Sequence, residues 1–339
     1  MRVWFNKTFS SIHSALRLIR EADVEGRYEL LASSPNPHAL VKLVAHQFFD
    51  EPSKLTGADY VDWCERFCVE HNIGIFVPGK EAALLAESHE RFARIGTRIM
   101  SCASHANLEL IHNKGQFYAT VNCPQAPSAE YLPCTNIDEF DHAYAELGKR
   151  HEALCLKPAV SVYGIGFRRI REDRTAFDIF AGGHEYQIDL ASLRTMLAAQ
   201  GSFPTLLVME YLAGHEFSVD CVADHGSLKC AVARRKPLGL NVGQIIDTRE
   251  DIQIACQQIT TQFGLNGYAN IQFKEGRDGL RILEINPRMS GGVAMACLAG
   301  PNLPYLGLAG FDQGYGMLSI PPIAEGMRVG EYNQATVFS

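Results

Sequence analysis

The fold is decided by residues 267–288, which read GYANIQFKEGRDGLRILEINPR. Asp278 and the glycine after it form a turn signal, and the alternating residues on both sides predict the two strands of a β-hairpin. If the pairing is antiparallel and centred on Asp278, Gln272 lies opposite Glu284. Because side chains on a strand alternate between faces, Asn286 then shares a face with both.

These three side chains bring oxygen donors together and predict a divalent-cation site. Magnesium prefers oxygen ligands and usually completes its shell with waters and substrate phosphates. Pro287 ends the ladder, so Arg288 projects beyond it as a two-pronged donor for phosphate. The alternative is a hairpin whose polar residues simply face solvent. The expected opposite face is apolar, with Leu283 and Ile285, and the gathering of oxygen donors on one face favours the metal site.

Two lysines form the second signal. Lys114 opens a helix, whereas Lys157 ends an apolar strand that leads to the loop 161–166. Glycines in that loop would let backbone N–H groups approach an anion closely, and we expect Tyr163 to belong to the same loop. The alternative is a strand-end lysine in water, and the loop lacks the Gly-Lys-Ser/Thr of a P-loop. The pair is placed to meet phosphate oxygens.

The third signal is the segment 206–220, which reads LLVMEYLAGHEFSVD. An apolar strand runs into Glu210, Tyr211 and Leu212, where backbone groups could pair with a purine edge and apolar side chains could pack on its rings. Glu216 could accept hydrogen bonds from ribose hydroxyls. The alternative is a buried strand and turn with a capping acid.

A short basic segment is the fourth signal. Arg234, Arg235 and Lys236 precede a loop with two glycines. Phosphoryl transfer depends mainly on charge stabilisation, so these cations are candidates to hold the reacting group. The alternative is a solvated basic turn. Because the two arginines are adjacent, the sequence leaves open which one faces the site.

Composition narrows the class of protein. The chain has 339 residues, 47% of them hydrophobic and 20% charged, with a net charge of −7, so no basic excess points to nucleic acid or a membrane surface. Ten cysteines are scattered without a C-x-x-C motif, which is typical of a reducing compartment. No apolar run has membrane-spanning length, and we expect a cytoplasmic protein. Neither a catalytic histidine cluster nor a zinc spacing is present.

Three parts of the chain differ in the order of their expected strands and helices, and together they predict an α/β fold. Residues 1–111 alternate strands and helices, which indicates a mostly parallel sheet that holds ligands past its strand ends, where Lys7 and Lys80 fall. We expect a smaller module at 112–206 and a third at 207–339. A dinucleotide-dependent oxidoreductase would need G-x-G-x-x-G after the first strand, and no glycine occurs there.

In their order and spacing, the motifs at 112–310 resemble the ATP-grasp superfamily. The Gln-Glu-Asn set is most similar to the carbamoyl-phosphate-synthetase-like branch of carboxylate–amine ligases. The start of the chain, RVWFNKTFSSIHSALRLIR at 2–20, looks like an ATP-grasp group found beside tellurite-resistance genes. The loop 161–166 departs from the family because it is poorer in glycine than in many relatives.

The resemblance implies an ATP-grasp fold behind an N-terminal Rossmann-like domain, with ATP and Mg²⁺ or Mn²⁺ as cofactors. It implies an ADP-forming ligase that activates a small carboxylate as an acyl-phosphate and joins it to an amine. The alternative is an ATP-binding regulatory protein without ligase activity. A homodimer fits the resemblance but is not established by the sequence. The implied roles are phosphate binding by Lys114 and Lys157, nucleotide contacts by Glu210, Tyr211, Leu212, Glu216 and Leu283, metal binding by Gln272, Glu284 and Asn286, and catalysis by Arg288, Arg235 and Lys157.

Overall fold

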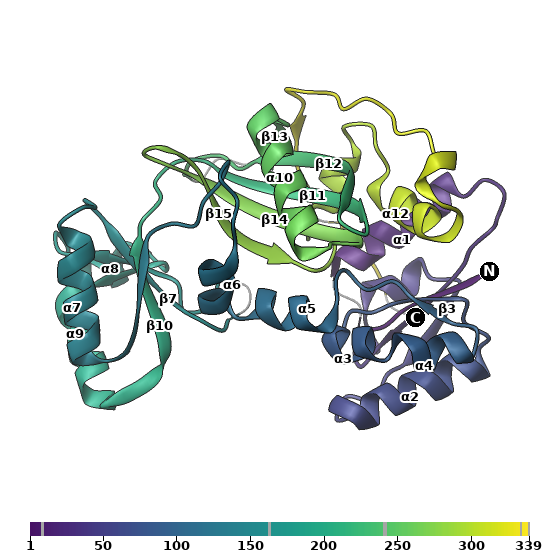
Figure 1. Cartoon of the computed structure of the whole chain (residues 1–339), viewed down its shortest axis with the longest axis horizontal. Helices are drawn as coiled ribbons and strands as arrows, with labels where there is room; N and C mark the ends of the chain where they lie inside the picture. Colours follow the sequence, from purple (N-terminus) through teal and green to yellow (C-terminus); the bar gives the residue numbers. More distant parts are fainter. Residues whose placement is uncertain (8–9, 162–163, 240–242, 333, 338–339) are drawn as a thin grey trace.

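Three β-sheets organise the chain in a computed structural model that describes residues 1–7, 10–161, 164–239, 243–332 and 334–337. Figure 1 shows them as three parts in a row, with the second sheet at one end, the third in the middle and the first at the other end. Among the described residues, no helix is both long and apolar enough to cross a bilayer. All ten cysteines are free thiols.

The first sheet is parallel throughout, in the order β3-β2-β1-β4-β5. Its elements are β1 (Arg2–Phe5), α1 (Ser10–Ala22), β2 (Glu29–Ser34), η1 (Leu40–Leu43), β3 (Gln47–Asp50), α2 (Gly57–Glu70), β4 (Ile75–Val77), α3 (Ala82–Glu87), α4 (His89–Arg94) and β5 (Arg98–Ile99). Helix α1 packs with Val3 and Phe5, while α2 packs with Trp4. Since alternate residues of β1 face opposite sides, these helices cover the two faces of the sheet. The strand order reverses between β1 and β4, where such sheets bind ligands.

The second sheet has the order β6-β10-β7-β8-β9, and α7 and α9 pack with it in one apolar core. Its elements are β6 (Tyr131–Asn136), α7 (Ile137–Gly148), β7 (Leu154–Pro158), β8 (Arg168–Arg171), α8 (Ala176–Ala181), β9 (Gln187–Asp189), α9 (Leu190–Gln200) and β10 (Ser202–Glu210). Strand β10 runs through the expected boundary between 206 and 207 and pairs with both β6 and β7 beyond it. The wider division of the chain into three domains stays a prediction.

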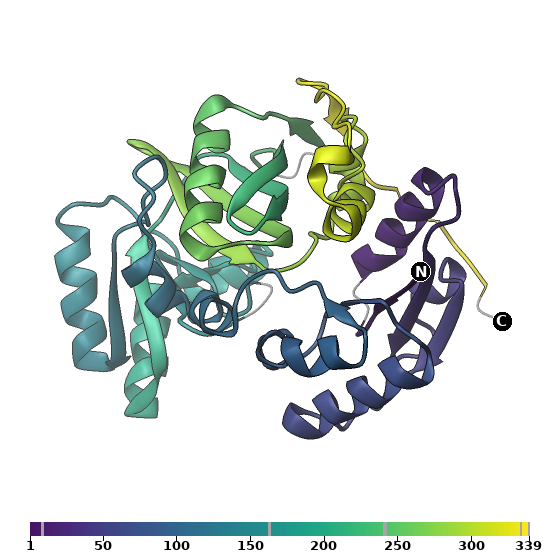
Figure 2. The same cartoon turned by 45° about the vertical axis from the view of Figure 1, so that its right-hand side comes forward.

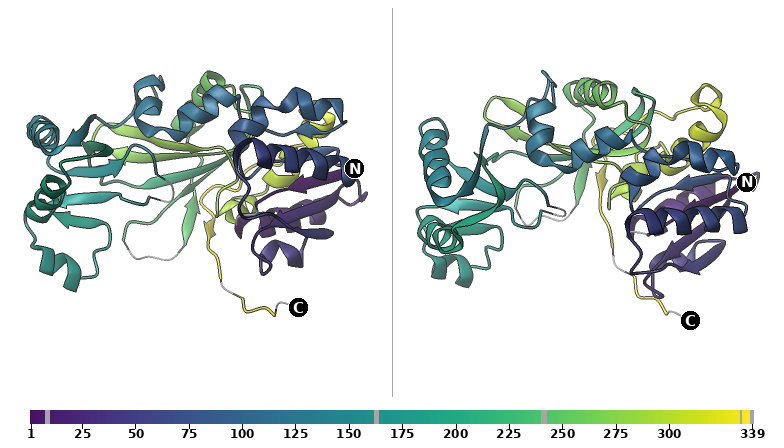
Figure 3. Two further views of the ribbon diagram at one scale, coloured as in Figure 1. Left: turned by 90° about the horizontal axis from the view of Figure 1, so that it is seen from below. Right: turned by 60° about the horizontal axis from the view of Figure 1, so that its bottom comes forward.

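The third sheet has the order β15-β14-β11-β12-β13-β16. Its elements are β11 (Glu216–Asp224), β12 (Ser227–Arg235), β13 (Gln244–Ile246), α10 (Glu250–Phe263), β14 (Gly267–Gly276), β15 (Gly279–Asn286), α11 (Val293–Cys297), α12 (Leu303–Gln313), η2 (Tyr315–Met317) and β16 (Arg328–Val329). Helix α10 covers one face, and the other face packs with α12 and α1 in a shared apolar core. Helices α5 (His105–His112) and α6 (Lys114–Thr120) connect the first sheet to the second, as Figures 2 and 3 show.

Candidate functional site

A cleft of about 480 Å³ lies between the second and third sheets. Elements from both sides contribute to it, because α6, β7 and the end of β10 face β14 and β15. Every predicted site residue except Arg235 lines this one cleft: Lys114, Lys157, Glu210, Tyr211, Leu212, Glu216, Gln272, Leu283, Glu284, Asn286 and Arg288. Residues that are far apart in the sequence are therefore brought together as the motif order suggested.

The predicted pairing of Gln272 with Glu284 is confirmed. Gly276 pairs with Gly279, so the turn is centred slightly before Asp278, where it was expected. A regular ladder that started from this pair would place Gln272 opposite Leu283. A β-bulge in β15 adds one residue and restores the pairing with Glu284. Leu283 was expected on the opposite face, and this was wrong. At the bulge it lines the cleft instead.

The oxygen donors of the hairpin fit a hard divalent cation. The Asn286 amide nitrogen donates to Glu284 Oε1 at 3.0 Å, and the Gln272 amide nitrogen donates to Asn270 Oδ1 at 3.2 Å. The amide oxygens of Gln272 and Asn286 are then available beside the carboxylate. Within the described part of the chain, no group of three His, Cys, Asp or Glu side chains could hold a metal. A cation here would need one carboxylate, the amides and phosphate oxygens, which is a set that magnesium accepts.

Both predicted lysines reach the same part of the cleft. Lys114 Nζ lies 3.8 Å from Glu284 Oε2 and donates to the Ser161 carbonyl at 2.7 Å. Lys157 Nζ donates to the Tyr118 hydroxyl at 2.5 Å, and that hydroxyl donates to the Leu283 carbonyl. Burial lowers the pKa of both lysines, while the Glu284 carboxylate opposes this. Two partly desolvated ammonium groups beside one carboxylate form a strong site for an anion.

The end of β10 and the residues that follow it also line the cleft. Tyr211 N donates to the Ala153 carbonyl at 2.9 Å, and Leu212 is buried. Glu210 Oε1 lies 3.9 Å from His151 Nδ1. Glu216 forms an ion pair with Lys236, which also lines the cleft. A ribose hydroxyl would therefore meet an ion pair there and not an isolated carboxylate.

The structure resolves the choice between the two adjacent arginines. Arg234 shares a face with Gln272, but it is buried, and its guanidinium donates to Asp220 at 2.9 Å and to Ser290 at 2.8 Å. Arg235 faces the opposite side and pairs with Asp247 at 2.7 Å. The placement of Arg235 in the site was wrong, because strand alternation turns its side chain away from the cleft.

Sequence reasoning missed residues that hold the site together. The Tyr118 hydroxyl connects Lys157 to β15. The sequence signal for this role was the spacing of four residues from Lys114, which places both side chains on one face of α6. Asp220 binds Arg234 and accepts a hydrogen bond from Ser290 N at 3.1 Å. The sequence could indicate only that Asp220 lies on the same face of its strand as Ser218, two residues earlier. Tyr163, predicted in the phosphate loop, lies outside the described residues.

Solved structures share the fold over most of the chain. The N5-carboxyaminoimidazole synthetase of Staphylococcus aureus in complex with ADP matches with a TM-score of 0.65 and 12% identity, covering 95% of this chain and 80% of that one. The L-amino acid ligase of Bacillus licheniformis matches with a TM-score of 0.62 and 12% identity, covering 91% and 73%. The chain has the ATP-grasp fold. The expected fold class is thereby confirmed.

Sequence comparison adds further similarities. Residues 202–335 match the family described as "ATP-grasp in the biosynthetic pathway with Ter operon". This is the group that the start of the chain suggested, although the match covers β10 and the third sheet and not the start. Two carbamoyl phosphate synthase large chains also match, one from Methanospirillum hungatei (25% identity, 64% of this chain) and an arginine-specific one from Geobacillus stearothermophilus (24%, 83% of this chain). The chain spans only 20% and 25% of their lengths.

Proposed function

We propose that this protein is an ATP-dependent ligase that activates a carboxylate and joins it to an amine. One observation carries the proposal: a single cleft brings Lys114 of α6 and Lys157 of β7 against the oxygen donors of β14 and β15 and against Arg288, which follows β15. This combination suits a nucleotide triphosphate with its metal. The complex of a structural relative with ADP and the ligase named among the others support the same reading.

Each group of residues in the cleft has a proposed role that follows from its position. Lys114 and Lys157 neutralise phosphate charge, and the segment from Glu210 to Leu212 holds the adenine. Gln272, Glu284 and Asn286 would hold Mg²⁺ or Mn²⁺, and a bound ion would supply positive charge against the phosphates. Arg288 stabilises the negative charge that develops on the phosphoryl group in transfer.

The reaction has two steps that need no covalent link to the protein. A carboxylate oxygen attacks the γ-phosphorus, the bond from that phosphorus to the β–γ bridging oxygen breaks, and ADP leaves. The amine nitrogen then attacks the acyl carbon, the carbon–oxygen bond to phosphate breaks, and the amine proton passes to solvent. The cleft contributes by holding the reactants in reach and by placing cations where charge develops.

The test is ADP release from ATP and Mg²⁺ with a panel of carboxylates, each with and without an amine. We expect release that depends on the carboxylate and rises with the amine. A protein that binds ATP but releases no ADP with any pair would instead be a nucleotide-binding regulator, which would overturn the proposal. Dimerisation is a separate prediction that sedimentation can check.

A further inference from the structure

A second pocket, of about 690 Å³, opens beside the main cleft, and Ala129 and Glu210 line both. Small-molecule sites measure roughly 300–1,000 Å³. The lining comes from the segment that leads into β6, from the turn after α7, from the end of β10 and from the turn end of the β14–β15 hairpin. In this order the lining residues are Pro127, Ser128, Ala129, Glu130, Tyr131, Arg150, His151, Glu210, Arg277, Asp278 and Arg281. The pocket therefore connects the second sheet with the hairpin of the third.

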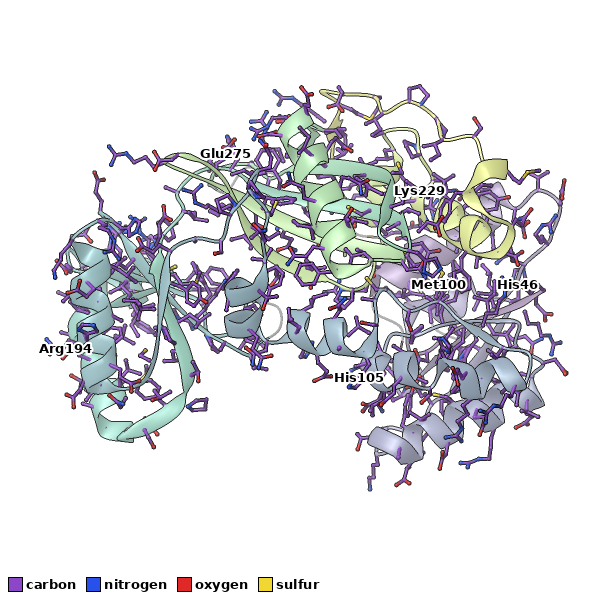
Figure 4. All side chains as sticks on the ribbon, viewed as in Figure 1. His46, Met100, His105, Arg194, Lys229 and Glu275 are labelled. Atoms are coloured by element: carbon purple, nitrogen blue, oxygen red, sulfur yellow. The ribbon has the colours of Figure 1, made fainter. Side chains whose placement is uncertain are left out.

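The walls of this pocket are held in place by contacts on the hairpin. Ile282 N donates to the Pro127 carbonyl at 3.2 Å, which fixes the segment before β6 along the edge of β15. On β14, Glu275 pairs with Arg249 at 2.7 Å and accepts a hydrogen bond from His215 N at 3.2 Å. Figure 4 shows Glu275 near the turn end of the hairpin. Because this support is already ordered, a ligand would not have to order it on binding.

The cations of the pocket are incompletely neutralised. Arg150 and His151 share one carboxylate, that of Glu130, at 2.5 Å and 2.6 Å. The Arg281 guanidinium donates to the preceding backbone carbonyl at 3.3 Å, and within the described part of the chain neither it nor Arg277 forms an ion pair. A guanidinium group binds phosphate through two parallel N–H donors. The hairpin end therefore offers two such groups to an anion.

One carboxylate, that of Glu210, lies deeper than the rim. Its side chain is 12% exposed, against 51% for Arg150. A Cβ at Gly276 would lie 3.6 Å from Glu210 Oε1 and 3.6 Å from Arg281 Cγ, so both side chains reach the space beside this glycine. His151 Nδ1 lies 3.9 Å from the same carboxylate oxygen. A molecule that places an anion against the arginines would therefore place its other polar groups near an acceptor of hydrogen bonds.

We infer that this pocket binds a phosphate monoester that carries hydroxyl groups, such as a sugar phosphate, and that the bound ester strengthens nucleotide binding in the main cleft. Arg277 and Arg281 would hold the phosphate, Glu210 would accept hydrogen bonds from the hydroxyl groups, and Pro127 and Tyr131 would pack against the carbon skeleton. The ester would bridge the second sheet and the hairpin, which are also the two walls of the main cleft. Its binding would therefore favour the arrangement that holds a nucleotide.

Glu130 connects the pocket to the segment that is proposed to hold adenine. Its backbone carbonyl accepts a hydrogen bond from Glu210 N at 3.0 Å, while its carboxylate holds Arg150 and His151. A ligand at the arginines and a purine at the backbone of Glu210 would therefore act on one connected group of residues. The effect is reciprocal, so a bound nucleotide strengthens the binding of the ester by the same factor. This coupling rests on the proposed function, whereas binding of the ester in the pocket does not.

Calorimetry of ribose 5-phosphate with the full chain tests the binding, because this probe has both the phosphate and the hydroxyl groups. A non-hydrolysable ATP analogue and Mg²⁺ are present at saturation, so that the probe cannot occupy the phosphate end of the main cleft. We expect a Kd at least about tenfold below those of ribose and inorganic phosphate, and Arg281→Gln should raise it about tenfold. Arg194→Gln is the control and should leave the Kd within about twofold. Arg194 is an exposed arginine of α9 that pairs with Asp141 at 2.6 Å, and Figure 4 shows it far from the hairpin end.

The same titration without the analogue measures the coupling, and we expect the Kd for ribose 5-phosphate to be about fivefold higher there. An equal Kd would overturn the coupling. Displacement of the probe by the analogue would place both in one cleft and overturn the pocket assignment. Inorganic phosphate that binds as tightly as the ester, or an unchanged Kd in Arg281→Gln, would overturn it as well. Binding of the probe to a chain that does not bind the analogue would overturn the proposed function but support the pocket.

Discussion

Two neighbouring hairpins of the third sheet carry similar polar faces but use them differently. In β11–β12, Arg234 and Asp220 bind each other and Ser290, and all three are buried. In β14–β15, Gln272 and Glu284 line an open cleft. Polar and apolar residues alternate along part of β11 as they do along part of β14. Polar groups become structural where a neighbouring segment covers them and become available for a ligand where the sheet ends beside a cleft.

Glu284→Ala should have the largest effect on activity, because it removes the single carboxylate of the proposed metal set. We expect ADP release to fall roughly 10³-fold, as for other losses of charge stabilisation in a transition state. The free energy of unfolding should change little, since the side chain lies at the cleft. Steady-state kinetics and urea denaturation check both. Full activity in this variant would rule out the metal assignment.

Arg234→Met should have the largest effect on stability and would sharpen the contrast between the hairpins. It leaves the buried Asp220 carboxylate without its guanidinium, so we expect a loss of about 3 kcal/mol in the free energy of unfolding. Urea denaturation measures the loss. The double variant Arg234→Met, Asp220→Leu should recover part of it. A stable but inactive Arg234→Met would contradict the assignment and make Arg234 a ligand-binding residue.

The pH dependence of nucleotide binding tests the buried lysines. Burial lowers the pKa of Lys114 and Lys157 below the ordinary value of 10.5, whereas bound phosphate favours their charged forms. As pH rises through the lowered pKa values, the lysines lose their protons and ADP affinity should fall, about tenfold in total, before pH 10.5 is reached. Calorimetry across this range checks the direction. An affinity that stays constant up to the ordinary lysine range would contradict the role of the pair.

Arg235→Ala should have the smallest effect. Its guanidinium forms a partly exposed ion pair with Asp247 on the far face of the sheet, and such pairs contribute about 0–1 kcal/mol. We expect activity within about twofold of the parent protein, by the same kinetic assay. A loss comparable to that in Glu284→Ala would show that Arg235 reaches the cleft during turnover.

Much of the site was predictable because its residues lie on regular strands. The pairing of Gln272 with Glu284 and the strand-end position of Lys157 follow from alternation and turn chemistry. Strand alternation also places Arg234 on the same face of the sheet as Gln272, but this follows only once the register of β12 is known. Tyr118 and Asp220 were not predictable, since their contacts join elements far apart in the sequence. The sequence also gave no sign that one strand, β10, continues from 202 to 210 across the expected domain boundary.

The extra residue at Leu283 also affects how related chains should be aligned. The register of the hairpin shifts by one position at the bulge, so counting from the turn gives the wrong residue opposite Gln272. A relative whose strand is regular would need a loop one residue longer to present the same oxygen. Equivalent residues should therefore be located from the Asn-Pro-Arg end, where the chain leaves the sheet.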